Sequence, residues 1–143
     1  MLTLLIGHRG TGKSSFLKRL EHYHANTSAH STSSVVLFFD LDILIEAQTQ
    51  KSILQIFQEF GETEFRKLEI QQFLFFLKQN DWTTRDLILA VGAGFPLNLF
   101  IDSLKQTQFL WIRRETDNLG RIFLNRPRLK STQTYQEEYQ TLF

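Results

Sequence analysis

Gly7-His8-Arg9-Gly10-Thr11-Gly12-Lys13-Ser14 fits the pattern Gly-x-x-x-x-Gly-Lys-Ser/Thr of a phosphate-binding loop. The apolar run at residues 2–6 precedes it, and apolar residues at helical spacing follow it. At an average glycine usage of about 7%, chance produces this pattern in roughly one chain of this length in a few hundred. The order of apolar run, loop and helical segment disfavours a glycine-rich turn that binds nothing. The sequence therefore predicts a nucleotide site in its first residues.

The residue types within this loop have separate uses. Glycine permits positive φ and lets backbone N–H groups approach phosphate oxygens without a Cβ in the way. Lys13 supplies a flexible positive charge for the β- and γ-phosphates, and the Ser14 hydroxyl can ligate Mg²⁺. The helix that begins near Lys13 adds the positive end of its dipole. The residues expected to bind ATP here are Gly10, Thr11, Gly12, Lys13, Ser14 and Ser15.

The composition is typical of one globular domain over residues 1–143, with 42% hydrophobic and 22% charged residues. A net charge of +1 predicts neither a nucleic-acid footprint nor a membrane-binding patch. The chain has no cysteine, which excludes disulfides, thiolate zinc sites and a cysteine nucleophile. No apolar run approaches the length of a membrane span or of a signal-peptide core. We therefore expect a cytoplasmic monomer without nucleic-acid or membrane partners.

Apolar runs alternate along the chain with segments of helical periodicity. Strands are predicted near residues 2–6, 35–39, 87–91 and 108–112. Helices are predicted near residues 13–24, 43–47, 53–60, 62–78, 97–105 and 134–143. Gly61 separates the third helix from the fourth, and Pro96 starts the fifth. This alternation predicts an α/β fold, in which right-handed crossovers place helices on both faces of a mostly parallel sheet.

Two of the predicted strands end in residues that suit a ligand site. Asp40 and Asp42 follow the second strand, at the edge where open α/β sheets place their ligands. Asp40 could hold Mg²⁺ opposite Ser14, and Asp42 could accept a proton from a substrate hydroxyl. The alternative is that one of these aspartates only caps the next helix. The third strand ends in Gly92-Ala93-Gly94, whose small residues permit close backbone approach to a ligand.

Several arginines have two interpretations. Arg66 lies at the edge of the apolar stripe of the longest predicted helix, where an arginine is usually solvated. Arg121, Arg126 and Arg128 lie in an irregular basic segment at residues 118–130. That segment is either a solvated loop or a lid over the transferring phosphate.

With these residues the chain resembles shikimate kinase, of the nucleoside-monophosphate-kinase-like group, over residues 2–129. Many nucleotide-binding proteins share the phosphate loop, so the later landmarks are the more diagnostic ones. These landmarks are Phe39-Asp40-Leu41-Asp42, Ile45-Glu46, residues 53–57, Gly61-Glu62-x-x-Phe65-Arg66-x-x-Glu69, Gly92-Ala93-Gly94 and Arg126-Pro127. The resemblance implies a three-layer P-loop kinase fold, with substrate-binding helices at about residues 43–80 and a lid at about residues 118–130.

The resemblance also implies an activity, the Mg²⁺-dependent transfer of the γ-phosphoryl group of ATP to the 3-hydroxyl of shikimate. The catalytic residues that it implies are Lys13, Asp42 and Arg126. The metal site that it implies is formed by Ser14 and Asp40. The substrate contacts that it implies are Asp42, Arg66, Gly92, Ala93 and Gly94. Arg66 would pair with the shikimate carboxylate, and Arg121 would stack on adenine.

The sequence departs from the family at three points. The usual run of three glycines is Gly92-Ala93-Gly94 here, and His8-Arg9 is an unusual pair inside the phosphate loop. The family continues beyond the position of Phe143 with a second arginine for the carboxylate and with a fifth strand, so a free sheet edge is expected at residues 108–112. These departures keep two alternatives open: a kinase of another small sugar acid, and a nucleotide-binding relative without catalysis.

Overall fold

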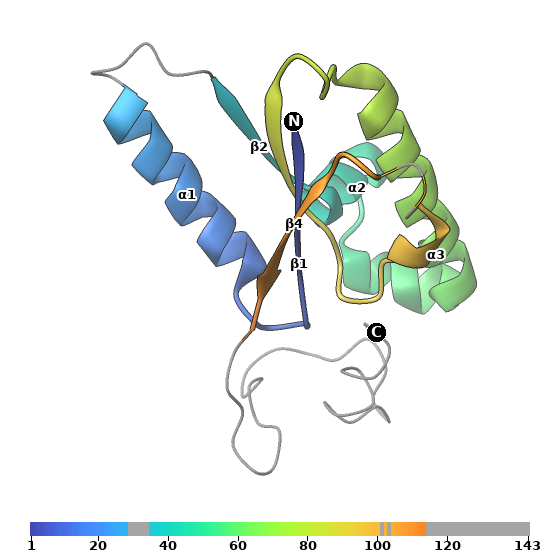
Figure 1. The fold of residues 1–143 in the computed structure, drawn as a ribbon. Coiled ribbons are helices and arrows are strands. Elements are labelled where there is room, and N and C mark those ends of the chain that lie inside the picture. The colour runs from blue at the N-terminus through green and yellow to red at the C-terminus, as the bar shows by residue number, and fades with distance from the viewer. Residues whose placement is uncertain (29–34, 101, 103, 114–143) are drawn as a thin grey trace.

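Figure 1 shows the computed structural model, which describes residues 1–28, 35–100, 102 and 104–113. The strands are β1 (Leu2–Gly7), β2 (Val36–Asp40), β3 (Asp86–Ala90) and β4 (Gln108–Ile112). The helices are α1 (Lys13–Ser28), α2 (Leu41–Thr49) and α3 (Ile53–Gln79), and a 3-10 turn, η1 (Leu97–Leu99), precedes β4. Arg121, Arg126, the expected lid at residues 118–130 and the helix expected at residues 134–143 lie outside the described residues.

The four strands form one sheet in the order β2-β3-β1-β4, and every neighbouring pair is parallel. The chain leaves β1 through α1 and enters β2, and β3 later fills the position between these two strands. α1 covers one face of the sheet, and α2 and α3 cover the other (Figure 1). Each predicted strand lies within one residue of the observed bounds. The predicted α/β fold is confirmed.

Alternate residues of the central strands face the two helical layers. Leu4 of β1 belongs to a large apolar cluster with α2, α3 and the segment after β3, whereas Leu5 packs against α1. In the large cluster the rings of Phe73, Phe95 and Phe100 meet at centroid distances between 4.9 and 5.7 Å. These rings hold the segment that follows β3 against α3, and the first residues of that segment belong to the candidate site.

The helix expected at residues 97–105 is wrong in length and in kind. Among the described residues of that range, only Leu97–Leu99 are helical, and they form a 3-10 turn. No side chain caps this turn after Pro96. Phe100 and Leu104 are both buried, and the Leu104 N–H bonds to the Phe100 carbonyl at 2.9 Å. Both side chains belong to the large apolar cluster, so packing against that cluster shapes this part of the chain in a way that periodicity alone does not report.

The other helices differ from the prediction at their ends. α1 extends to Ser28, beyond the predicted end at His24, and Thr27 Oγ1 donates to the Tyr23 carbonyl at 2.9 Å. This bond satisfies the hydroxyl within the last turn, but bonds of this kind do not favour a helix, so it does not explain the extension. The separation expected at Gly61 is confirmed: α3 consists of two helical segments that meet at a kink at that glycine, where φ is 80° and ψ is 176°.

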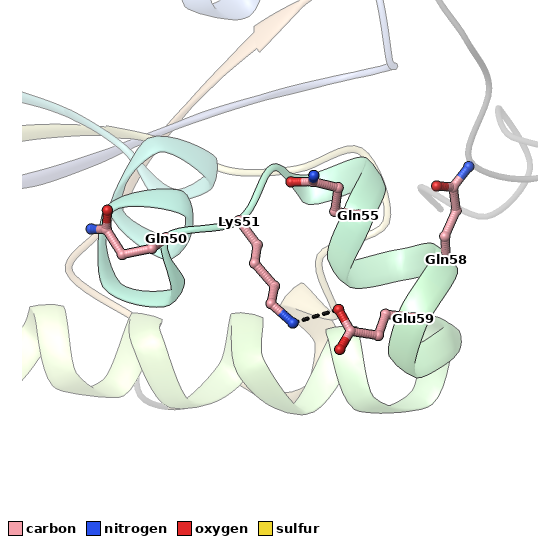
Figure 2. A pocket seen from close by; sticks show the side chains of 5 residues that line it. All are labelled: Gln50, Lys51, Gln55, Gln58 and Glu59. Atoms are coloured by element: carbon pink, nitrogen blue, oxygen red, sulfur yellow. Dashed lines mark hydrogen bonds and ion pairs between the residues drawn. The ribbon is translucent and has the colours of Figure 1, made fainter.

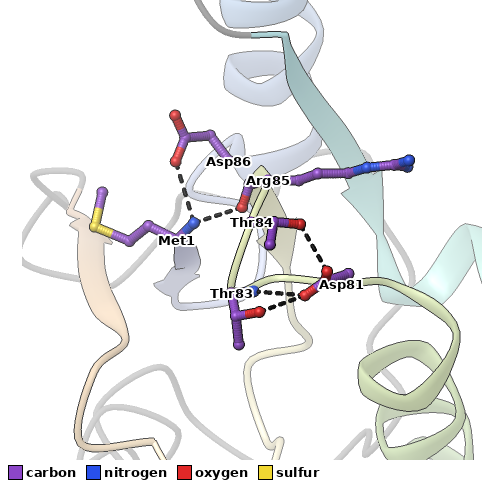
Figure 3. A network of polar contacts seen from close by, with 6 residues as sticks. All are labelled: Met1, Asp81, Thr83, Thr84, Arg85 and Asp86. Carbon is purple, nitrogen blue, oxygen red and sulfur yellow. Dashed lines mark hydrogen bonds and ion pairs between the residues drawn. The ribbon is translucent and has the colours of Figure 1, made fainter.

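Polar contacts join the amino-terminal ends of β1 and β3 (Figure 3). The Met1 amino group donates to the Asp86 carboxylate at 3.1 Å. In the turn before β3, hydrogen bonds from Thr83 and Thr84 lower the pKa of Asp81. Since the strands are parallel, the predicted ligand residues lie at the opposite edge of the sheet, where β1, β2 and β3 end.

Two further expectations concern the outer surface. β4 pairs with β1 alone among the described strands, so its other side is a sheet edge within this part of the chain. Across the described residues, no helix has the length and apolar character needed to cross a membrane.

Candidate active site

The phosphate loop connects the carboxyl end of β1 to the first turn of α1. Gly10 and Gly12 have φ values of 76° and 90°, in the region that glycine adopts at low cost. Lys13 Nζ donates to the carbonyl oxygens of Gly7, at 2.7 Å, and His8, at 2.9 Å. The backbone of the loop thus holds the lysine ammonium across the loop.

His8 is a buried member of this loop, with 1% of its surface exposed. Burial lowers the pKa of its imidazole, and the nearby positive charges of Lys13 and Arg113 lower it further. The ring is therefore neutral near pH 7. Of the unusual pair His8-Arg9, the histidine adds no positive charge to the phosphate loop.

A hydrogen bond connects the first turn of α1 to the end of β2. Ser14 Oγ donates to Asp40 Oδ2 at 2.7 Å. The other oxygen of this carboxylate, Oδ1, accepts from the Asp42 backbone N–H at 3.0 Å and caps α2. One of the two aspartates therefore does cap the helix that follows, and it is Asp40 and not Asp42.

The Ser14–Asp40 pair fits the predicted magnesium site. A hydroxyl oxygen and a carboxylate oxygen lie side by side, and both are hard donors. Mg²⁺ takes one or two such protein ligands and fills its remaining positions with water and substrate phosphates. The pair also lies next to the phosphate loop, because Ser14 directly follows Lys13.

Carboxylates and a ring on its own helix surround Arg66. Its Nη1 donates to the Glu69 carboxylate, and its Nε lies 3.8 Å from Glu62 Oε1. The guanidinium carbon lies 5.2 Å from the centre of the Phe65 ring, and 26% of the side chain is exposed. The interpretation of Arg66 as a solvated surface arginine is therefore wrong, because its neighbours on α3 fix the guanidinium.

Glu69 is the residue of this cluster to which the sequence assigned no role. Its side chain is fully buried. Burial raises the pKa of Glu69 to about 7; the charge of Arg66 opposes this shift, and those of Asp42 and Glu62 add to it. The sequence held two signals for it: its spacing, since a residue three positions after Arg66 shares its helix face, and its place at the end of the landmark that begins at Gly61.

The turn after β3 approaches this cluster closely. A Cβ at Gly92 would lie 2.7 Å from Glu69 Oε1 and 3.7 Å from Asp42 Oδ1. A Cβ at Gly94 would lie 2.8 Å from Arg66 Cζ. The one methyl group of this run falls at Ala93, between the two positions of close approach. The structure thus brings together the predicted substrate residues Asp42, Arg66, Gly92 and Gly94, with Glu69 among them.

Both groups of residues lie at one edge of the sheet, beyond the ends of β1, β2 and β3. Asp40 contacts the phosphate-loop helix, and Asp42, two residues later, faces the Arg66 cluster. Open parallel sheets bind ligands at this edge. The arrangement can therefore place a phosphate donor at the loop and an acidic acceptor at Arg66, with Asp42 between them.

A surface hollow of about 350 Å³ at the junction of α2 and α3 is a separate feature (Figure 2). An ion pair between Lys51 and Glu59 spans it. The residues that line it are Gln50, Lys51, Gln55, Gln58 and Glu59. None of them is a predicted site residue, and all are exposed or half-buried. The candidate site lies instead at the carboxyl ends of β1, β2 and β3, where buried charged groups converge.

Comparison with known proteins agrees with this arrangement. A family model described as shikimate kinase matches residues 9–143. The chain is 32% identical to the shikimate kinase of Bartonella henselae over 133 residues. This match covers 92% of this chain and 56% of that protein. It is 36% identical to the shikimate kinase of Flavobacterium johnsoniae over 93 residues, a match that covers 65% of this chain and 46% of that protein. The chain thus spans about half the length of the curated relatives it matches.

Solved structures show the same likeness. The shikimate kinase of Aquifex aeolicus, 26% identical, superposes with a TM-score of 0.56 over 99% of this chain and 82% of that one. The shikimate kinase of Acinetobacter baumannii, solved in complex with shikimate, is 25% identical and superposes with a TM-score of 0.58 over 80% of this chain and 56% of that one. Because the family model covers nearly all of the sequence, the chain belongs to the shikimate kinase family.

Proposed function

We propose that the chain supplies the catalytic site of a shikimate kinase, which transfers the γ-phosphoryl group of ATP to the 3-hydroxyl of shikimate. One observation carries this proposal. A complete phosphate loop, in which Ser14 is bonded to Asp40, lies at the carboxyl ends of the strands. The guanidinium of Arg66 lies at the same ends, and neighbouring groups fix it in place. A simple nucleotide hydrolase has no need of the second group.

On the nucleotide side, Lys13 bridges the β- and γ-phosphates, and residues 10–15 surround them. The position of Lys13 supports this role, because two loop carbonyls already hold its ammonium over the loop. Ser14 and Asp40 hold Mg²⁺, which neutralises negative charge on the phosphates when it is bound. Arg121 and Arg126 keep their proposed places, on adenine and on the phosphates.

On the acceptor side, Arg66 binds the shikimate carboxylate and Asp42 binds its hydroxyls. The 3-hydroxyl oxygen attacks the γ-phosphorus, the bond from that phosphorus to the leaving oxygen of ADP breaks, and Asp42 accepts the hydroxyl proton. Gly92 and Gly94 let the turn lie close to the two side chains that position the acceptor, since an added Cβ would press on Glu69 or Arg66. The protein contributes mainly positioning and charge neutralisation.

A coupled assay of ADP release tests the proposal. Shikimate, gluconate and a blank without acceptor are compared with and without Mg²⁺, and we expect release that requires both shikimate and Mg²⁺. Lys13→Ala should abolish it. Lys51→Ala is the matched control, because it removes a lysine from the separate hollow.

Two outcomes would contradict the proposal. Release with gluconate but not with shikimate would indicate a kinase of another sugar acid. ATP binding without release for any acceptor would indicate a nucleotide-binding relative that lacks catalysis.

A further inference from the structure

We infer that Glu69 takes up a proton when an acidic substrate binds at Arg66, so that substrate binding weakens as the pH rises through neutrality. The inference rests on the proposed function, because it concerns the carboxylate that Arg66 is proposed to bind. Glu69 is a positioning residue here, since it acts through Arg66 and does not touch the reacting atoms.

The geometry makes Glu69 and the substrate share one guanidinium. Nη1 of Arg66 already donates a hydrogen bond to the carboxylate of Glu69, and its Nε lies 3.8 Å from Oε1 of Glu62. Nη2 lies close to Gly94, which is one of the predicted substrate residues. A carboxylate that binds through Nη2 therefore lies beside the carboxylate of Glu69.

The charges of the cluster do not favour a further anion. The groups that act on Glu69 are Arg66 and Glu62 from α3 and Asp42 from α2. The third segment against it, residues 92–94, has no titratable side chain. The cluster thus holds one guanidinium and three carboxyl groups, and a substrate adds a fourth. Water screens repulsion least at Glu69, the fully buried member of the set.

A proton on Glu69 removes this conflict without displacing Arg66. The raised pKa, about 7, means that the carboxyl is already partly protonated at neutral pH. Its Oε2 accepts from Arg66, whereas its Oε1 is buried and has no hydrogen-bond partner among the described residues. The proton can therefore occupy Oε1 while Oε2 continues to hold the guanidinium.

Linkage gives the size of the effect. If the protonated form alone accommodates the substrate, the dissociation constant rises about tenfold between pH 6 and pH 8. Over the same range, proton uptake rises from about 0.1 to about 0.9 protons per substrate bound.

Isothermal titration calorimetry with shikimate measures both quantities. Titrations at pH 6 and pH 8 are each run in two buffers that differ in ionisation enthalpy, and the difference in heat gives the number of protons taken up. We expect about 0.9 protons at pH 8 and about tenfold weaker binding than at pH 6. A merely structural role of Glu69 predicts no buffer-dependent heat.

Two variants assign the proton. Glu69→Gln keeps an acceptor oxygen for Arg66 but cannot titrate, so the uptake and the pH dependence of affinity should disappear. Glu62→Gln is the matched control, because it removes a half-exposed carboxylate from the same guanidinium and should keep both effects. If Glu69→Gln does not fold, the wild type and Glu62→Gln still decide the question.

Each outcome separates the inference from the proposed function. Shikimate binding with equal heats in both buffers at pH 8 would overturn the inference and leave the function standing. Proton uptake that persists in Glu69→Gln would also overturn it. Absence of shikimate binding at both pH values would overturn the inference and the proposed substrate together.

Discussion

Replacement of Gly92 by alanine measures how closely the turn after β3 packs on the buried carboxylate. The added Cβ would lie 2.7 Å from Glu69 Oε1, whereas ordinary contact begins at 3.4 Å, so a shift of about 0.7 Å is required. Glu69 cannot turn out to solvent, because its side chain is buried and bonded to Arg66. Overpacking of a fixed site costs about 1–3 kcal/mol.

Thermal unfolding followed by circular dichroism is the first assay for Gly92→Ala. For a domain of this size about 1 kcal/mol corresponds to roughly 2–4 °C, so we expect the melting temperature to fall by roughly 3–10 °C. Shikimate affinity should also fall, since Arg66 moves with Glu69. ATP affinity should be unchanged, because the phosphate loop does not contact this turn through Gly92.

Ala93→Gly is the matched control, because it alters the neighbouring position without adding an atom. If Gly92→Ala has the melting temperature of the wild type and binds shikimate with normal affinity, the argument that the turn at Gly92 packs tightly on Glu69 is refuted. A lower melting temperature with normal shikimate binding would show that the contact stabilises the fold but does not position Arg66.

Lys13→Ala should weaken ATP binding and abolish turnover without unfolding the protein, because a half-buried loop lysine contributes little to the core; unchanged affinity by calorimetry would contradict its role. Arg66→Ala should cost about 2–5 kcal/mol of shikimate binding, or roughly thirtyfold to a few thousandfold in affinity. Arg66→Lys should recover only part of this in the same titration, since the planar fork is lost, and normal affinity in either variant would exclude the contact. Because the folded protein raises the pKa of Glu69 from 4.5 to about 7, its contribution to stability is complete below pH 4.5 and is lost as the pH rises through 7. Urea denaturation should therefore show a free energy of unfolding that falls by up to about 3 kcal/mol between pH 4.5 and pH 8, with a smaller fall in Glu69→Gln; equal slopes in the two proteins would disprove the assignment.

Much of the fold follows from patterns that act over short distances. The order of strand, loop and helix in residues 2–28 was predicted from periodicity and loop chemistry, although α1 is longer than expected. The approach of Ser14 to Asp40 was also predictable, because parallel strands end at the same edge of a sheet. The functional roles of these residues stay predictions.

What the sequence did not predict depends on contacts between distant segments. Glu69 contributes to the site because the turn at Gly92 lies against its carboxylate, and no local pattern on α3 reveals that contact. Arg66 stands at the edge of an apolar stripe, a position that is compatible with solvation or with a fixed ion pair. The 3-10 turn at Leu97–Leu99 likewise ends at Phe100, whose ring packs on the rings of Phe73 and Phe95, contacts that periodicity does not report.

The two oxygens of Asp40 have a consequence for mutagenesis. One accepts from Ser14 and the other from the backbone N–H of Asp42, so this carboxylate both joins the proposed metal position and fixes the start of the helix that carries the proposed proton acceptor. Loss of activity in Asp40→Ala would therefore combine two defects, a missing cation partner and a displaced Asp42. Asp40→Asn separates them, because asparagine caps helices about as well as aspartate but carries no charge.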